Sequence, residues 1–294
     1  MEQWKLVREV GVQNGISNRN GRALEFTITR LLSQCENAQL TFKALEDLNR
    51  DQDKFDSLPI ILQRKYLSAS NKLIEWINDS FLHDRITIDK SNDGDSGSWD
   101  IQISSDIKKM RLSVKHNHSA LKHPRPYSLA QSCGYEKGSP EDVQHRMNLG
   151  KIASLYRENA AGQILFNENP QLLHDMLAKV SKACTLSLED WRKSNHSLAT
   201  NLFEFLVSNN YYKFEVFTTS GLSANLYDYT SIKSPDSLKS SSDKQYLQMD
   251  FDNSWLLRAR LHNASSKIGS NNRQLSLKYD VQKVHGLVRK ITLI

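Results

Sequence analysis

The stretch LSVKHNHSALKHPRP, residues 112–126, opens as a strand and continues as a basic loop. Apolar and polar residues alternate over residues 110–118, and the segment DIQI at residues 100–103 alternates in the same way. A turn-rich connection separates the two segments, so together they predict a β-hairpin. Because successive side chains of a strand point to opposite faces, the second strand has a polar and a mixed face. The first carries Arg111, Ser113, Lys115 and Asn117, and the second carries Leu112, Val114, His116 and His118.

Helices are expected on both sides of this hairpin. Residues 20–35 and about 58–82 repeat apolar residues at helical spacing, with Glu25 bordering the first stripe. Between the second helix and the hairpin, residues 89–100 are expected to form a Gly/Ser/Asp loop. After the hairpin, Ser139 is expected to cap a helix that begins at Pro140, with Glu141 and Asp142 in its first turn. Helices should continue from there to about residue 206.

The last third of the chain is expected to be rich in strands. Four segments alternate: YYKFEVFTT (211–219), QYLQMDF (245–251), SWLLRARLH (254–262) and QLSLKYDVQKV (274–284). A polar Ser/Lys/Asp tract at residues 231–245 is expected to be flexible. The order of elements predicts one mixed α/β, or α+β, domain over residues 1–294. Its parts would be a catalytic core at about 20–160, a helical segment at about 140–206 and a β-rich DNA-binding part at about 211–294.

Composition narrows the setting in which the protein acts. The 294 residues carry a net charge of +6, and the modest basic excess favours a polyanionic partner. The cysteines, Cys35, Cys133 and Cys184, are odd in number and far apart, which argues against a disulfide framework and a cysteine zinc site. The chain shows neither an apolar signal core nor a run long enough to span a membrane. A cytoplasmic protein without a membrane partner is expected.

The hairpin brings together residues that suit phosphodiester hydrolysis. Asp100 begins its first strand and Lys115 lies in the middle of its second, so an acid and a lysine on adjacent strands could meet. Such a reaction needs a carboxylate that holds Mg²⁺ and a cation that orients the attacking water. The alternative interpretation of the same residues is the solvated face of an ordinary hairpin.

The histidines of the stretch suit a metal site less well. His116 and His118 would supply only two ligands on a face that is otherwise apolar, and His123 lies beyond a loop. A zinc cage is therefore disfavoured, and a packed, hydrogen-bonded role for the histidines is the alternative. His116 has a suitable ordinary pKa for a proton carrier, but alternation turns it away from Lys115.

Basic side chains later in the chain favour a nucleic-acid surface. In residues 254–262 one face of the expected strand is apolar and the other is basic, and residues 274–284 alternate in a similar way, although an ordinary solvated sheet face is the alternative. The candidate DNA-binding residues are Asn117, Lys122, His123, Arg125, Arg258, Arg260, His262, Asn263, Ser265, Ser266 and Lys267.

Three blocks resemble the HaeIII family of type II restriction endonucleases: GRALEF, LSVKHNHSALKHPR and WLLRARLHNASSKIGSNNRQLSLKYDVQ. They occur in the family's order, and the middle block is the most specific. The resemblance implies a PD-(D/E)xK nuclease fold that cleaves double-stranded DNA at GGCC with Mg²⁺. It also implies that Lys115 is the catalytic lysine, Asp100 the metal-binding aspartate and Glu25 the acid of the first helix.

One departure from the family pattern concerns the metal ligands. Ser113 stands where the second acid of the motif usually stands. Glu25 or Asp95 could supply that carboxylate, and the carbonyl of Val114 is a further candidate ligand. Asp93 and Asp95, in the loop before Asp100, are alternatives to Asp100 itself.

The sequence thus predicts a Mg²⁺-dependent, site-specific endonuclease. The alternatives are a nucleic-acid-binding protein without catalysis and a related nuclease with another target. A palindromic target would be served by a homodimer, although a monomer could cut one strand at a time. The restriction role implies a cognate DNA methyltransferase as a functional partner.

Overall fold

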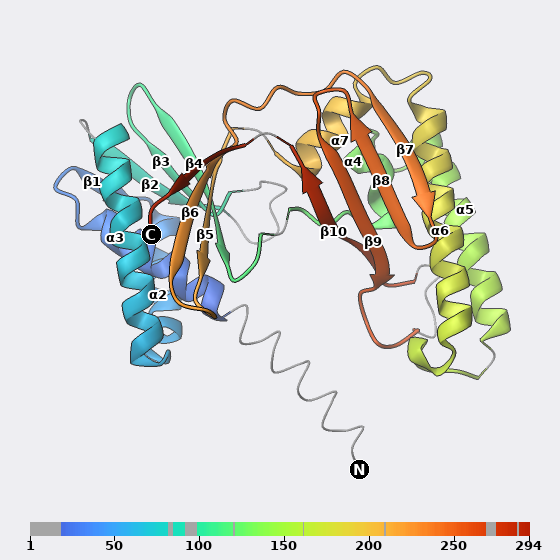
Figure 1. Ribbon diagram of the computed structural model, residues 1–294, viewed down its shortest axis with the longest axis horizontal. Coiled ribbons are helices and arrows are strands. Elements are labelled where there is room, and N and C mark those ends of the chain that lie inside the picture. The colour runs from blue at the N-terminus through green and yellow to red at the C-terminus, as the bar shows by residue number, and fades with distance from the viewer. Residues whose placement is uncertain are drawn as a thin grey trace, which may run out of the picture. The chain divides into compact units, whose positions relative to one another are not determined.

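The computed structural model describes residues 19–81, 85–91, 99–119, 121–160, 162–208, 210–268, 275–286 and 288–294 (Figure 1). The chain forms two compact units. The first unit comprises the part up to Ser119, Asn210–Ser231 and Val288–Ile294, and the second comprises Ala120–Asn209 and Ile232–Leu287. The chain therefore leaves the first unit twice and returns to it twice.

The first unit is built on a mixed seven-stranded sheet of order β1-β2-β3-β4-β5-β6-β11. Its strands β1 and β2 are parallel, as are β4 and β5, and the other neighbours are antiparallel. The predicted hairpin is confirmed, because β3 and β4 pair with Ile101 opposite Leu112. The strands are β1 (Ala38–Leu40), β2 (Ile86–Lys90), β3 (Ile101–Ser104), β4 (Lys109–His116), β5 (Tyr212–Phe217), β6 (Ser223–Asp228) and β11 (Arg289–Thr292).

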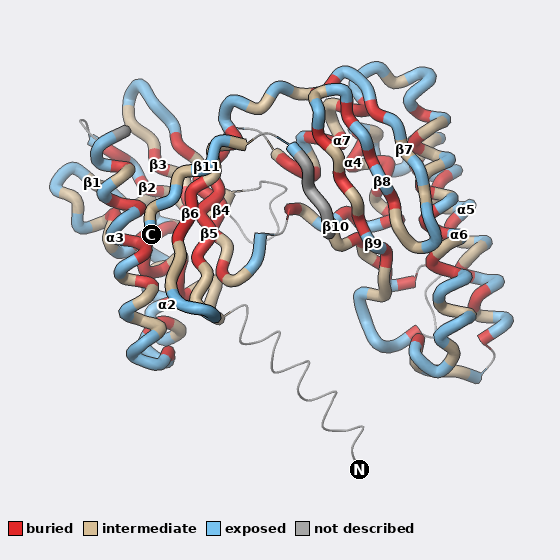
Figure 2. Tube along the Cα trace, viewed as in Figure 1, coloured by how far each residue is buried: buried red, intermediate tan, exposed pale blue. Residues whose placement is uncertain are grey.

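Helices supply the other half of the core of the first unit. They are a helix at residues 19–33, α2 (Phe42–Asp56) and α3 (Ile60–Phe81). The helix at 19–33 buries Leu24 and Ile28, which belong to one hydrophobic cluster with Leu112 and Phe214 from the sheet. Buried positions accordingly run along β4 and β5 (Figure 2). This core positions the polar side chains of β4 and β5 on the opposite face.

The second unit packs helices against an antiparallel four-stranded sheet of order β10-β9-β8-β7. Its helices are α4 (Leu129–Ser132), α5 (Pro140–Asn159), α6 (Pro170–Trp191) and α7 (Leu198–Leu206), with short 3-10 turns η1 (Pro126–Ser128) and η2 (Phe166–Glu168). Its strands are β7 (Leu238–Asp243), β8 (Tyr246–Phe251), β9 (Leu256–Asn263) and β10 (Leu277–His285). As predicted, Ser139 caps α5 and accepts a hydrogen bond from the Asp142 amide.

The predicted mixed α/β class is confirmed, but two details differ. The tract at 231–245 is not simply a flexible linker, because β7 lies within it and pairs with β8, and Leu238 is buried. The β-rich part expected at 211–294 is divided between the sheets, since β5, β6 and β11 hydrogen-bond into the first unit. Most of the loop expected at 89–100 lies outside the described residues. In the described part of the chain, no helix has the length and apolar character needed to cross a membrane.

Candidate functional site

The carboxylate of Asp100 lies beside the ammonium of Lys115, in the first unit. Asp100 immediately precedes β3, and its backbone amide donates to the carbonyl of Leu112 on β4 at 2.8 Å. Its Oδ2 lies 3.8 Å from Lys115 Nζ, and the side chains are 28% and 25% exposed. The hairpin register therefore brings the predicted acid and lysine together and leaves both accessible to a ligand.

Two further groups of β4 orient this carboxylate. The amide of Val114 donates to Asp100 Oδ2 at 2.6 Å, and the hydroxyl of Ser113 donates to the same oxygen at 3.2 Å. Ser113 is buried. The serine that replaces the expected acid thus acts as a hydrogen-bond donor that holds Asp100, and the predicted role of the Val114 carbonyl stays a prediction.

Glu25 approaches the same region from the helix at residues 19–33. Its carboxylate forms a short ion pair with the ammonium of Lys90 on β2, and both side chains are largely buried. Burial raises the pKa of Glu25, the Lys90 ammonium opposes that rise, and the charge of Asp100 adds to it. The carboxylates of Glu25 and Asp100 therefore interact electrostatically. Lys90 was not predicted to belong to the site. Its place in β2, two residues after the buried Ile88, indicates that its side chain faces the interior like those of Ile86 and Ile88.

Asp100 is a partly exposed carboxylate of the kind that binds Mg²⁺, whereas the Glu25 carboxylate is already paired with Lys90. Mg²⁺ is usually bound through one or two carboxylates together with waters and substrate phosphates. The described residues do not form a complete metal site from side chains alone, because they contain no group of three or more His, Cys, Asp and Glu side chains that could hold a metal ion. Asp95 and Asp93, the other predicted acids, lie outside the described residues.

The histidine next to Lys115 is packed into the core of the unit. His116 Nε2 lies 3.1 Å from Thr218 Oγ1, and its ring meets Tyr66 edge-on. Burial lowers the pKa of His116 to about 4, with a further contribution from His118. The ring is therefore neutral near pH 7, as expected of a packed histidine.

The predicted alternation of β4 ends at Asn117. This residue has a φ of 56°, which takes the chain out of the strand conformation. Its Oδ1 accepts from the Thr218 amide at 2.8 Å, and its Nδ2 donates to Thr218 Oγ1 at 3.3 Å. The side-chain amide of Asn117 thus links the end of β4 to the end of β5. Its predicted contact with DNA stays a prediction.

A buried ion pair on β5 completes the polar face and was not predicted. Parallel pairing places Lys213 opposite Ser113 and Glu215 opposite Lys115. Lys213 Nζ lies 2.9 Å from Glu215 Oε1, and the side chains are only 4% and 2% exposed. The alternation of charged and apolar residues in YKFEVF is the sequence signal that marks them.

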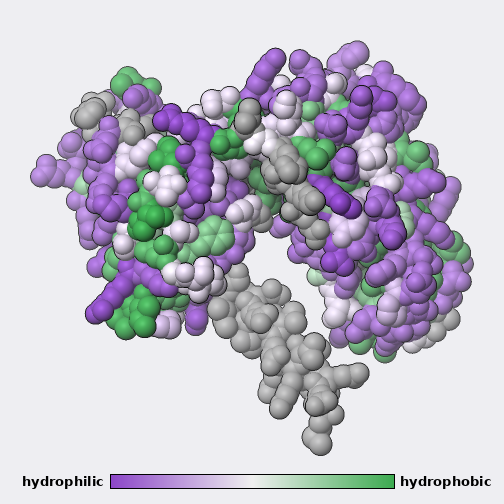
Figure 3. Space-filling model, in the orientation of Figure 1, coloured by the Kyte–Doolittle hydropathy of each residue, from purple (hydrophilic) through white to green (hydrophobic). Residues whose placement is uncertain are grey.

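The strand β9 of the second unit has the two faces that were predicted. Leu257, Ala259 and Leu261 are buried. Arg260 is exposed, whereas Arg258 lies over the Tyr246 ring at 4.3 Å and 3.6 Å from the Asp243 carboxylate. The face of this unit turned to the viewer is largely hydrophilic (Figure 3).

The carboxylate of Asp280 on β10 contacts two of the predicted DNA-binding histidines. His262 Nε2 lies 2.6 Å from its Oδ2, and His123 Nδ1 lies 3.2 Å from its Oδ1. Lys278 lies 3.4 Å from the same carboxylate. Burial, the largest effect, lowers the pKa of His123, and Asp280 opposes it. This face is therefore mixed in charge and not uniformly basic.

The remaining predicted DNA-binding residues lie in two loops of the second unit. Arg125 is exposed, and Lys122 lies 4.9 Å from the Phe205 ring, where burial lowers its pKa. The other loop follows β9, which ends at Asn263. The Nδ2 of Asn263 donates to the carbonyl of Ser265, whose hydroxyl donates to the carbonyl of Lys267. These two loop bonds are 2.8 and 3.0 Å long, and Ser265, Ser266 and Lys267 are exposed.

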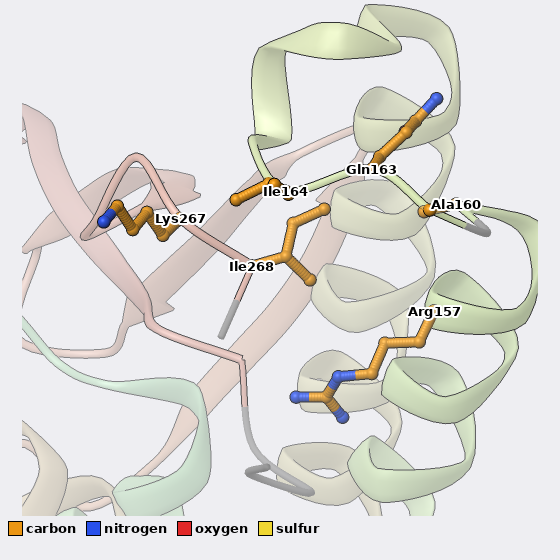
Figure 4. A pocket seen from close by; sticks show the side chains of 7 residues that line it. Arg157, Ala160, Gln163, Ile164, Lys267 and Ile268 are labelled. Atoms are coloured by element: carbon orange, nitrogen blue, oxygen red, sulfur yellow. The ribbon is translucent and has the colours of Figure 1, made fainter. Parts of the chain in front are cut away.

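A cavity of about 400 Å³ adjoins this second loop. Ile164, Ile268 and Ala160 line it together with Arg157 (Figure 4). The side chain of Lys267 points away from that of Arg157 (Figure 4). The lining of the cavity is thus mixed, since Gln163 and Lys267 line it as well.

Comparison with protein-family models, with curated proteins and with solved structures gives no match to this chain.

Proposed function

We propose that the protein is a Mg²⁺-dependent endonuclease that hydrolyses phosphodiester bonds of double-stranded DNA, in the manner of a type II restriction enzyme with a PD-(D/E)xK core. The contact between Asp100 and Lys115 on adjacent strands, at 3.8 Å, carries this proposal. The carboxylate of Glu25, which interacts electrostatically with Asp100, supports it. The target GGCC and the cytoplasmic location remain expectations from the resemblance and the composition.

In this mechanism each residue of the first unit has a separate task. Asp100 and Glu25 would hold Mg²⁺, which polarises the scissile phosphate and offsets the charge that develops on it. Ser113 and the Val114 amide keep Asp100 in one orientation through their hydrogen bonds. The ammonium of Lys115 orients the attacking water, and Lys115 could accept a proton from that water only in its neutral amine form. The water then attacks phosphorus directly, and the bond to the leaving oxygen breaks.

The second unit is assigned the DNA contacts. Arg260 and Arg125 are exposed, so their guanidinium groups can reach phosphates or guanine edges. A bidentate contact between arginine and guanine contributes about 1–3 kcal/mol of discrimination. Arg258 would exchange its neighbours Asp243 and Tyr246 for DNA.

The decisive experiment measures single-turnover cleavage of supercoiled plasmid with Mg²⁺. Lys115→Ala and Asp100→Ala should each slow cleavage on the order of a hundredfold or more. Lys109→Ala is the matched control, because Lys109 is an exposed lysine of the same strand. Circular dichroism must show that all variants are folded. Cleavage at the parent rate by a folded Lys115→Ala variant would contradict the proposed role.

A nucleic-acid-binding protein without catalysis is the second candidate. The exposed side chains of Arg125 and Arg260, which could contact phosphates without any catalysis, favour it. It predicts that plasmid stays intact with Mg²⁺ while the protein still retards DNA in a gel. If cleavage occurs, mapping of the cut ends distinguishes GGCC from another target.

A further inference from the structure

The buried ion pair of β5 borders Lys115 on the side away from Asp100. Because β3 and β5 flank β4, Asp100 and the pair stand on opposite sides of the Lys115 strand. Glu215 is the direct partner of Lys115 in the parallel register. Side chains in register on neighbouring strands project from the same face, about 5 Å apart. Lys115 therefore has two carboxylates within reach.

The carboxylate of Glu215 binds Lys213 and Ser119. Lys213 Nζ lies 2.9 Å from its Oε1, and the hydroxyl of Ser119 donates to its Oε2 at 2.7 Å. Lys213 also donates to the carbonyl of Ser119 at 3.0 Å. The rings of Tyr227 and Tyr229 on the β6 side lie 5.8 and 5.6 Å from the Lys213 ammonium. Both oxygens of Glu215 are thus occupied by Lys213 and Ser119, and the hydroxyl of Tyr227 also hydrogen-bonds with this carboxylate.

We propose that Lys213 is a positioning residue for the cleavage reaction: by neutralising Glu215 it prevents that carboxylate from drawing Lys115 away from Asp100. The inference rests on the proposed function. Lys213 and Glu215 are nearly inaccessible to a substrate, which excludes direct contact with DNA in this conformation. Any effect of the pair on cleavage is therefore indirect, and the register of Glu215 with Lys115 is the route that the inference uses.

A charge argument distinguishes this role from simple packing. When Lys213 loses its charge, Glu215 becomes a buried, uncompensated carboxylate, and a nearby ammonium is strongly attracted to it. Lys115 is that ammonium, since it faces Glu215 in register and its contact with the partly exposed Asp100 carboxylate is 3.8 Å long. When Glu215 loses its charge, it no longer competes with Asp100 for Lys115.

The test compares four variants under single-turnover conditions with saturating DNA and Mg²⁺. Lys213→Gln, whose amide can still donate to Glu215 and Ser119, should slow cleavage on the order of tenfold to a hundredfold, because small displacements of reacting groups are costly. Lys213→Arg, Glu215→Gln and the double variant K213Q/E215Q should cleave within about threefold of the parent. DNA affinity should be unchanged in all four.

Equal losses in Lys213→Gln and Glu215→Gln would overturn the inference, since a merely structural pair is disrupted from either side. The same holds if the double variant is as slow as Lys213→Gln. Lys193→Gln, at a lysine whose side chain is 72% exposed, is the control.

A crystal structure of Lys213→Gln supplies a readout that needs no cleavage. Lys115 Nζ should lie within about 4 Å of the Glu215 carboxylate, the usual limit for an ion pair. A Lys115 that stays on Asp100 in this variant refutes the inference. If instead the parent protein fails to cut DNA, the proposed function fails, and the position of Lys115 still decides whether Lys213 directs it.

Discussion

Asp100 accepts hydrogen bonds from β4 and also carries the charge that faces Lys115, and two substitutions separate these roles. Asp100→Asn keeps an oxygen acceptor for the Val114 amide and the Ser113 hydroxyl but removes the negative charge. Asp100→Ala removes the acceptor and the charge together. Because Val114 and Ser113 are buried, solvent cannot easily replace the lost acceptor.

The two variants should differ in stability. An unsatisfied buried donor costs about 1–3 kcal/mol, and the Val114 amide cannot turn away as the Ser113 hydroxyl can. We therefore expect Asp100→Ala to lower the free energy of unfolding by about 2–4 kcal/mol and Asp100→Asn by about 1 kcal/mol. For chains somewhat shorter than this one, each kcal/mol corresponds to roughly 2–4 °C in Tm.

Cleavage should not follow this order. Both variants lack the charge that would hold Mg²⁺, so both should cut DNA on the order of a hundredfold or more slowly. Urea unfolding and single-turnover plasmid cleavage measure the two properties on the same preparations. The reasoning is refuted if Asp100→Asn cuts at the parent rate, or if Asp100→Ala is as stable as Asp100→Asn.

Three further predictions concern the second unit. Arg260→Ala should reduce the slope of log Kd against log salt concentration for DNA binding by about one, whereas Lys193→Ala should leave it unchanged, as measured by fluorescence anisotropy. Burial lowers the pKa of His145 below its ordinary value of 6.5. Its stabilising contribution is therefore complete above pH 6.5 and is lost as the pH falls below that value, and His145→Asn should flatten this acid-side loss in urea unfolding. Phe203 is fully buried and its ring meets those of Phe251 and Trp255 edge-on. Phe203→Ala should therefore lower the free energy of unfolding by about 3–5 kcal/mol. A much smaller change in urea unfolding would contradict its place in the core.

Local patterns predicted most of the elements around the candidate site. The alternation in residues 100–103 and 110–118 correctly indicated β3 and β4, although β4 ends at His116, since a hairpin depends on neighbouring residues. The cap at Ser139 was correct for the same reason, because capping involves one turn of helix. The strands β1, β2, β6 and β11 and the fifteen-residue helix α2 were not predicted.

Contacts between distant segments could not be derived in this way. The pairing of β4 with β5 joins residues about a hundred positions apart, and no local pattern specifies which strands become neighbours. The Lys213 and Glu215 pair and the contact between Glu25 and Lys90 follow from that pairing and from helix packing. The positive charge of the predicted basic face of β9 was overestimated, because Asp280 on the adjacent strand β10 and Asp243 on β7 place carboxylates beside its basic side chains.

The sequence by itself determined the hairpin, the face on which Ser113 and Lys115 lie, and the meeting of Lys115 with Asp100, because strand alternation and a short connection are local properties. Only the tertiary structure decided what surrounds that pair. In that structure Ser113 donates a hydrogen bond to Asp100, and Glu25 forms an ion pair with Lys90. A buried ion pair on β5 lies next to the strand of Lys115. The physical reason is that burial and long-range strand pairing set the charge around each group, and both depend on segments far apart in the chain.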